Sequence, residues 1–517
     1  MNGADSVVQT LVNAGIEICF ANPGTSEIHL VASLDEQKGL RPILCLHEGV
    51  ATGAADGYGR MTDKPAATLL HLGPGLANGL ANLHNARRAR TPIVNLVGGH
   101  ATFHDRYAES PLASDIEGFA RPVSAWVHRT ANSMTAAADA ARAVEAALRP
   151  PGQITTLIIP ADSAWEEAGD PAPPLPRPPI AKVGRAAINR VASALKRAGK
   201  SAILMRGAAL KERGLKAAGR IAGKTGARIF YDTIVPRIQR GAGRVKAERV
   251  PYFSEAAVKT FHDTDLLILV GANPPVSLFG SPENASWSLP ENCAILYLAH
   301  AHEDGVAALE EVAEAIGAPT EPEGVAELDL PSPSEDANLN AGTVAQVVAY
   351  HLPENAIIVD ETVSAGHELH PATTTARPHD HLTVCGGSIG WALSAAVGAA
   401  VACPERKTIC LHGDGGAAMG LQALWTQARE NLAVTTVIYA NRSYAVLNME
   451  MTRAGFHNLG PLAQSLFDLD RPSLDWVRLS EAMGVEASRA ETVSAFSHQF
   501  ASALRATGPP RLIEAVI

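Results

Sequence analysis

The chain of 517 residues lacks the features that mark several specialised classes of protein. It has no stripe of lysine and arginine, and its formal net charge of −10 argues against a nucleic-acid partner. The longest apolar run, residues 391–403, is too short to span a bilayer, and no basic segment precedes the first apolar residues as in a secretory signal. The six cysteines form no C-x-x-C pair and lie mostly in apolar runs, as in proteins of a reducing compartment. We therefore expect a cytoplasmic protein with no membrane or nucleic-acid partner.

What the chain does contain is an ordinary globular composition. Hydrophobic residues make up 46% and charged residues 19%, which suits a protein with a large core. Proline-rich stretches at residues 170–179 and 319–336 favour extended linkers over helices or strands. These stretches divide the chain into three blocks, residues 1–169, 180–318 and 337–517, which we expect to be three domains.

Each block alternates short apolar runs with helical stretches. The predicted strands are residues 17–20, 43–46, 66–70, 93–97 and 155–159 in the first block, 201–205, 228–231, 266–270 and 294–299 in the second, and 357–359, 408–411, 434–439 and 511–515 in the third. Apolar strands separated by helices are typical of parallel sheets covered on both faces. The expected fold is three doubly wound parallel-sheet α/β domains.

The most informative motif is a glycine-rich turn in the third block. Gly413-Asp414-Gly415 follows the predicted strand 408–411, and Asn441 and Ser443 follow the next strand, 434–439. Because adjacent parallel strands end at one edge of a sheet, a carboxylate, an amide and a loop carbonyl should meet there. Hard oxygen ligands of this kind suit Mg²⁺ or Ca²⁺ with a diphosphate as co-ligand. The residues therefore predict a metal-bridged diphosphate at this edge.

The same turn also fits the dinucleotide fingerprint G-x-G-x-x-A, which leaves a nucleotide-binding oxidoreductase as an alternative. That fingerprint expects an acidic residue at the end of the second strand, but this strand ends in Ala440-Asn441. In addition, Asp414 would repel a pyrophosphate unless a cation lay between them. Both observations favour the metal site.

The segment from Gly413 to Ser443 resembles the thiamine diphosphate motif of the 2-oxo acid decarboxylase and acetolactate synthase family. The resemblance implies that Asp414, Asn441 and the main-chain carbonyl of Ser443 hold Mg²⁺. It also implies that the cofactor contacts Gly413, Gly415, Gly416 and Tyr444. Ala440 and Arg442 depart from the family pattern without removing a ligand. The three blocks match the family's order of pyrimidine-binding, central and diphosphate-binding domains, so the resemblance covers the whole chain.

A second part of the resemblance lies at His47-Glu48-Gly49, after the predicted strand 43–46. In the family, the glutamate at this place accepts a hydrogen bond from the cofactor's aminopyrimidine ring and favours its imino tautomer. Such proton sharing works best in a dry site, which the apolar end of a strand supplies. The alternative is that Glu48 only caps the next helix or pairs with Arg60.

Four further residues resemble family positions at the substrate or cofactor. Thr25 takes the place of a small polar residue in an active-site loop, and His71, before Gly73-Pro74-Gly75, stands where benzoylformate decarboxylase has a histidine. An imidazole there can move protons, although a structural histidine at a strand end is the alternative. His100 is a second candidate for the substrate pocket. Ile389 matches the aliphatic residue that wedges between the cofactor's two rings, a proximity effect.

Several other patterns do not support a site. Residues 219–225 look like a phosphate loop but lie in a helical stretch and lack the first required glycine. The pairs His300/His302 and His379/His381 have no cysteine or acidic cluster beside them, so we expect surface loops rather than metal ligands.

Glu450 is the clearest departure from both relatives. It stands where benzoylformate decarboxylase has Phe and acetolactate synthase has Trp, and both aromatic residues line the substrate pocket. Glu450 either makes the pocket polar, which the neighbouring metal loop favours, or points into solvent. The central block also has no histidine near residues 276–279, where benzoylformate decarboxylase has its second catalytic histidine.

The resemblance implies a thiamine diphosphate- and Mg²⁺-dependent carbon–carbon lyase or transferase acting on 2-oxo acids. We expect decarboxylation with carboligation, as in acetolactate synthase, and benzoylformate-type decarboxylation is the alternative. A non-catalytic regulatory relative is disfavoured because Glu48, Asp414 and Asn441 are all present. In the family the cofactor lies between two subunits, which implies a homodimer or homotetramer. FAD is not indicated by any motif, and its retention in the central block stays open.

Overall fold

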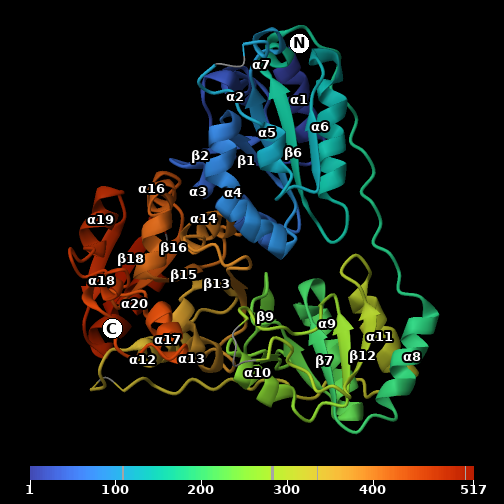
Figure 1. The fold of residues 1–517 in the computed structure, drawn as a ribbon, viewed down its shortest axis with the longest axis vertical. Helices are drawn as coiled ribbons and strands as arrows, with labels where there is room; N and C mark the ends of the chain where they lie inside the picture. Colours follow the sequence, from blue (N-terminus) through green and yellow to red (C-terminus); the bar gives the residue numbers. More distant parts are fainter. Residues whose placement is uncertain (108–109, 281–284, 335, 507) are drawn as a thin grey trace. The chain divides into compact units, whose positions relative to one another are not determined.

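The computed structural model describes residues 1–517 except 108–109, 281–284, 335 and 507 (Figure 1). The chain folds into two compact units. The first unit contains residues 1–178, 332–370 and 384–517, and the second contains residues 179–331 and 371–383. The first unit therefore combines the first block with most of the third block of the sequence.

The N-terminal part of the first unit is a six-stranded parallel sheet in the order β2-β1-β3-β4-β6-β5. Its strands are β1 Ile18–Asn22, β2 Arg41–Leu44, β3 Ala66–Leu70, β4 Ile93–Gly99, β5 Trp126–Arg129 and β6 Ile154–Pro160. The connecting helices are α1 Gly3–Asn13, α2 Ile28–Glu36, α3 Glu48–Thr62, α4 Leu72–Ala89, α5 Ile116–Ala120, α6 Ser133–Ala147 and α7 Ala161–Trp165. Helices α1 and α6 bury one face of the sheet through an apolar cluster that includes Val7, Leu11 and Val144. The strand β5 is half-buried along its length, and its lack of a continuous apolar run explains why the sequence did not predict it.

The C-terminal part of the first unit contains five parallel strands in the order β17-β18-β16-β15-β13. They are β13 Ala356–Glu361, β15 Thr408–Gly413, β16 Val434–Ala440, β17 Glu486–Ala490 and β18 Arg511–Val516. The helices are α12 Ala341–His351, α13 Gly366–Ala372, α14 Ala392–Ala402, α15 Asp414–Ala417, α16 Gln422–Arg429, α17 Ala445–Arg453, α18 Pro461–Ser465, α19 Trp476–Ala482 and α20 Val493–Arg505.

Helices α3 and α14 join these two parts of the first unit, and Figure 1 draws them side by side with α4 next to α3. Glycines allow the two backbones to touch. A Cβ at Gly57 would lie 2.1 Å from the carbonyl oxygen of Ala395, and a Cβ at Gly398 would lie 1.8 Å from that of Ala54. This close packing brings the start of α3, where Glu48 lies, near the loop that precedes α14.

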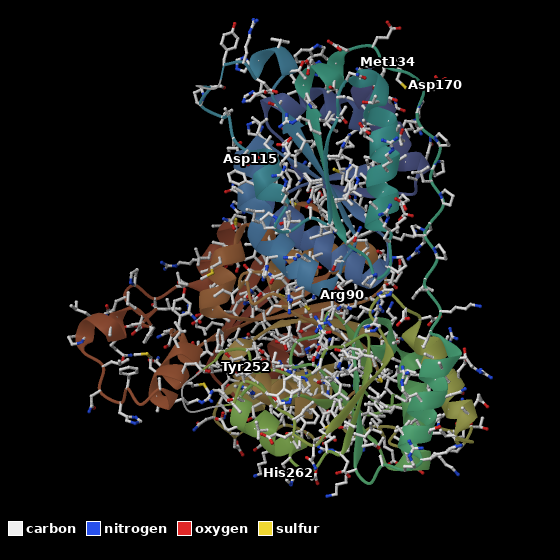
Figure 2. All side chains as sticks on the ribbon, turned by 45° about the vertical axis from the view of Figure 1, so that its right-hand side comes forward. Arg90, Asp115, Met134, Asp170, Tyr252 and His262 are labelled. Atoms are coloured by element: carbon white, nitrogen blue, oxygen red, sulfur yellow. The ribbon has the colours of Figure 1, made fainter. Side chains whose placement is uncertain are left out.

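The second unit contains a five-stranded parallel sheet in the order β10-β8-β7-β11-β12. Its strands are β7 Ser201–Met205, β8 Arg228–Tyr231, β10 Glu248–Arg249, β11 Leu266–Val270 and β12 Ala294–Ala299. The helices are α8 Arg185–Leu195, α9 Glu212–Thr225, α10 Ser254–Phe261 and α11 Gly305–Ala315. Separate apolar clusters bury its two faces. In Figure 2, His262 marks the end of α10 on this unit, whereas Asp115 caps the start of α5 on the first unit.

The three parallel-sheet α/β domains that the sequence predicted are confirmed, with one antiparallel addition. Within the second unit, β9 Ile238–Arg240 pairs antiparallel with β14 His379–Thr383. Both His379 and His381 are buried on β14, so the expectation of a surface loop for this pair was wrong. The alternating sequence of β14 carries polar side chains that only the partner strand and tertiary packing explain. His300 and His302 are exposed as expected, and residues 219–225 lie in α9.

The block boundaries inferred from the prolines remain predictions, although each predicted strand lies within its block. No helix among the described residues is both long and apolar enough to cross a membrane.

Candidate active site

The glycine-rich turn of the C-terminal sheet is the junction between β15 and α15. Asp414, the first residue of α15, is 4% exposed. Its Oδ1 accepts a hydrogen bond from the N–H of Gly415 at 2.8 Å, and its Oδ2 accepts one from the N–H of Arg442 at 2.6 Å. The second bond joins the end of β15 to the loop after β16, so the two strand ends meet as their order in the sheet requires. Burial raises the pKa of Asp414, because loss of water outweighs these N–H bonds.

The loop after β16 holds the other two predicted metal ligands. Asn441 Oδ1 accepts a hydrogen bond from the N–H of Ser443 at 3.1 Å. The Ser443 hydroxyl donates to the carbonyl of Phe467 at 3.1 Å, and the N–H of Tyr444 donates to the same carbonyl at 2.9 Å. The loop is therefore fixed from outside by Phe467, a contact distant in sequence that no local pattern could have shown.

The glycines of the turn are required by their neighbours. A Cβ at Gly415 would lie 2.5 Å from the ring of Tyr444, and a Cβ at Gly416 would lie 2.8 Å from the imidazole of His412. A side chain at Gly415 would push against the loop that carries Asn441, and one at Gly416 would push against β15. Tyr444 thus supports the turn by packing against it, consistent with its place beside the predicted cofactor residues.

Glu48 is the first residue of α3, and it is only 5% exposed although it is an acidic residue. His47, rather than Glu48, caps the helix, with its Nδ1 accepting a hydrogen bond from the N–H of Gly49 at 3.0 Å. Glu48 Oε2 accepts a hydrogen bond from Asn78 Nδ2 at 3.0 Å, and Oε1 has no hydrogen-bond partner among the described residues. Arg60 pairs instead with Asp56 at 2.6 Å. Neither structural alternative for Glu48 is present, and one carboxylate oxygen is available to a ligand.

A cavity of about 450 Å³ lies between the start of α3, α4 and the loop before α14. It is lined by His47, Gly49, Val50, Asn78, Ala81, Asn82, residues 387–390, Ser394, Met419 and Gly420. Ile389 is 38% exposed at this cavity, and Asn78, which holds Glu48, lines it as well. The structure therefore brings the region of Glu48 and the predicted wedge residue to one cavity.

His71 lies at the N-cap of α4, directly after β3, and contacts a glutamate that the sequence analysis did not assign. Its Nδ1 is 2.8 Å from Oε2 of Glu27, whose side chain is fully buried. Glu27 also accepts hydrogen bonds from the N–H of Gly24 at 2.8 Å and that of Leu72 at 3.4 Å. Thr25 is exposed in the same short helical turn as Glu27. The structure therefore places Thr25 and His71 at neighbouring strand ends, with Glu27 between β1 and β3.

The two weaker candidates lie away from the described cavity. His100 follows β4, its ring centroid is 5.1 Å from that of His104, and its buried Nε2 has no hydrogen-bond partner among the described residues. Glu450 lies on α17 with its side chain 36% exposed, and its Oε1 is 3.3 Å from Nη1 of Arg453. Neither residue lines the cavity between α3 and α14.

The sequence analysis missed four polar residues around these groups, namely the buried Glu27, Asn85 and Glu361 and the exposed Asn78. Glu27 had a local signal, because a glutamate at the third position of a helical turn commonly accepts a hydrogen bond from the N–H of the N-cap residue, here Gly24. The other three act across long sequence separations, for which a single sequence carries no signal.

Comparison with known proteins adds family information to this geometry. Residues 1–115 match the thiamine pyrophosphate enzyme N-terminal TPP binding domain, and residues 363–515 match the corresponding C-terminal TPP binding domain. A Mycobacterium tuberculosis H37Rv protein provisionally named acetolactate synthase large subunit IlvX is 46% identical over 521 residues, covering 100% of this chain and 99% of that protein. The benzoylformate decarboxylase of Pseudomonas aeruginosa is 26% identical over 528 residues, covering 96% of this chain and 95% of that enzyme.

Solved structures show the same fold. The thiamine diphosphate-dependent 4-hydroxybenzoylformate decarboxylase of Rhodococcus jostii RHA1 aligns with a TM-score of 0.84 at 23% identity, covering 100% of this chain and 99% of that one. The benzoylformate decarboxylase of Polynucleobacter necessarius aligns with a TM-score of 0.83 at 19% identity, covering 100% and 99%. At these identities the likeness shows the fold and not the substrate.

Proposed function

The chain belongs to the thiamine pyrophosphate enzyme family, in the group of acetolactate synthases and benzoylformate decarboxylases. On this premise we propose that it decarboxylates a 2-oxo acid and joins the remaining fragment to a second carbonyl compound. The observation that carries the catalytic part is the buried Glu48 carboxylate, held by Asn78 with one oxygen free beside a cavity. The full-length likeness to the acetolactate synthase-type relative supports the carboligation.

The turn at Asp414 fits a divalent cation. Burial makes the charged form of the Asp414 carboxylate costly, and Mg²⁺ would offset that cost. Asp414, Asn441 and the carbonyl of Ser443 would hold the ion, and the glycine turn would leave room for a diphosphate beside it. The requirement for Mg²⁺ is thus part of the proposal.

Glu48 would act at the other end of the cofactor. Thiamine diphosphate, when bound, supplies a nucleophilic carbon and an electron sink for the loss of CO₂. Glu48 Oε1 would accept a hydrogen bond from a ring nitrogen of the cofactor, while Asn78 keeps Oε2 in place. Water is largely excluded there, which strengthens the proton sharing.

His71 would hold and move a proton at the substrate. The Glu27 carboxylate can only accept hydrogen bonds, so His71 donates from Nδ1 and leaves Nε2 as its proton-accepting nitrogen. Thr25, exposed next to Glu27, would contact the substrate carboxylate or carbonyl.

The same histidine favours a second candidate, simple benzoylformate-type decarboxylation. A proton donor at the substrate completes aldehyde release, whereas carboligation needs a second carbonyl to arrive before that proton. His71 with its Glu27 partner could serve either outcome, so the product distribution must decide.

An oligomer is also part of the proposal. From the family resemblance we expect a homodimer or homotetramer. Retention of FAD by the central block can be tested from the absorbance of the purified protein.

The proposal is tested by product analysis with thiamine diphosphate and Mg²⁺ supplied. We expect pyruvate alone to give acetolactate, and EDTA to abolish the reaction. Formation of benzaldehyde from benzoylformate without a ligated product would establish the second candidate instead. Absence of turnover with any 2-oxo acid, despite bound thiamine diphosphate, would contradict both.

A further inference from the structure

The loop that carries Ile389 is held on one side by a buried asparagine of α4. Asn85 has no solvent exposure. Its Oδ1 accepts hydrogen bonds from the N–H groups of Gly386 and Ser388 at 3.0 and 3.2 Å, and its Nδ2 donates to the carbonyl of Ser388 at 2.7 Å. The Asn85 side chain therefore both accepts from and donates to the backbone on the N-terminal side of Ile389, as a neighbouring main-chain peptide group does in a sheet.

The other side of the loop is held by Glu361, at the end of β13. Its Oε1 accepts a hydrogen bond from the N–H of Gly390 at 2.6 Å, and its Oε2 accepts bonds from those of Trp391 and Ala392, each at 2.8 Å. Glu361 is 2% exposed. Ile389 thus lies between two backbone segments that are each fixed by a buried side chain.

These six hydrogen bonds restrict a loop whose glycines would otherwise leave it flexible. Gly387 and Gly390 flank Ile389 with φ of +73° and +91°, and glycines give a backbone the greatest conformational freedom. Asn85 and Glu361 restrict that freedom, yet Ile389 is left 38% exposed at the cavity wall. The main effect of fixing the backbone on both sides is therefore to fix the position of the Ile389 side chain.

We propose that Asn85 is a positioning residue, which fixes the loop so that Ile389 keeps the two rings of the cofactor in their reactive arrangement. The inference rests on the proposed function, because it assigns Asn85 an effect on bound thiamine diphosphate. It also links the first block to the third, since α4 comes from the N-terminal part and Ile389 from the C-terminal part of the same unit.

The test compares Asn85→Leu, which removes all three loop bonds at similar volume, with Asn95→Leu. Asn95 is an equally buried asparagine on β4 that bonds Thr68 and Thr156 and does not touch the loop. The readout is the rate at which the C2 proton of bound thiamine diphosphate exchanges with D₂O, measured without substrate. Calorimetry gives the cofactor Kd of each protein.

We expect Asn85→Leu to slow C2 exchange by about tenfold to hundredfold with less than about a fivefold change in Kd. Asn95→Leu should leave the exchange rate of the bound cofactor within about twofold. Ile389→Ala should slow exchange as well, and the double variant should be no slower than the slower single variant, because both changes act on one step.

Unchanged exchange in Asn85→Leu, or effects that multiply with those of Ile389→Ala, would overturn the inference. If Asn85→Leu does not fold, Asn85→Asp decides the question. That variant keeps an acceptor for Gly386 and Ser388 and loses the Nδ2 donor to the Ser388 carbonyl and to Asn82 Oδ1. Exchange should therefore slow by a smaller factor, and an unchanged rate would refute the role. Failure of the wild-type protein to bind thiamine diphosphate would refute the proposed function itself, which is a different result.

Discussion

Replacing Glu27 by glutamine should slow turnover by about 10- to 100-fold without unfolding the protein. The side chains have the same size, and Glu27 is fully buried. In the wild-type protein its carboxylate accepts hydrogen bonds from Gly24, Leu72 and His71. Because a carboxylate has no proton to donate, the tautomer of His71 is fixed with its hydrogen on Nδ1.

The magnitude follows from the bond that is lost. A glutamine can turn its NH₂ group towards His71 Nδ1, which shifts the ring hydrogen to Nε2 and removes the nitrogen that takes up the substrate proton. A hydrogen bond to a charged group contributes about 1.5–3 kcal/mol. Since 1.36 kcal/mol corresponds to a factor of ten in rate, the expected loss is about one to two orders of magnitude.

The assay is steady-state turnover of the accepted 2-oxo acid at saturating cofactor and Mg²⁺. Thermal unfolding and the cofactor Kd serve as controls for general damage, and both should change little. His71→Ala supplies the matched comparison, because adding Glu27→Gln to that variant should reduce kcat no further. Near-normal turnover of Glu27→Gln, or a further loss in the double variant, would refute the reasoning.

Three other substitutions test the remaining parts of the site. Glu48→Gln should keep the cofactor Kd within about tenfold and lower kcat by about 10²–10⁴, as measured with saturating thiamine diphosphate; normal kcat would contradict its acid–base role. Asp414→Ala should abolish Mg²⁺-dependent cofactor binding in calorimetry, because the ion loses its only carboxylate; tight binding of NAD by the wild type would favour a dinucleotide site. Glu450→Phe should leave the ratio of kcat/KM for benzoylformate and pyruvate within about threefold, because the Glu450 carboxylate pairs with Arg453 outside the described cavity; a tenfold rise would place this residue in the substrate pocket.

The parallel strands were predictable because each is an apolar run between helical stretches. Thirteen runs were predicted, and the strands β3, β7, β8, β11 and β12 begin and end at the predicted residues. The strands that were missed, including β5 and β14, are short and carry polar or half-buried residues, so they depend on their neighbours rather than on local sequence.

The site was predictable where its chemistry is concentrated in one turn. Asp414 and Asn441 follow adjacent strands, and the topology of a parallel sheet brings such ends together. The residues that hold the site, Asn85 and Glu361, were not predictable, because they contact backbone groups of residues 386–392 and backbone groups leave no trace in a sequence.

Residues with a positive φ mark places where the backbone is strained and other contacts must hold it. Asp63 and Arg90 have positive φ as C-caps of α3 and α4, where this conformation is ordinary. Leu72, Val363 and Arg442 also have positive φ, of 49°, 48° and 54°, but they end no helix. For residues with a Cβ this conformation costs about 1–2 kcal/mol each, so other contacts must maintain it.

For two of these residues the contact is one of the site carboxylates. The N–H of Leu72 donates to Glu27, and the N–H of Arg442 donates to Asp414. Each carboxylate therefore holds a strained residue next to a functional one, since Leu72 follows His71. Substituting either acid releases the strain as well as breaking the bond, so the loop can relax away from its active geometry. For this reason Asp414→Ala should lose more activity than the loss of one hydrogen bond explains. Glu27→Gln keeps an acceptor for Leu72, so its loss of turnover should stay within about 10- to 100-fold.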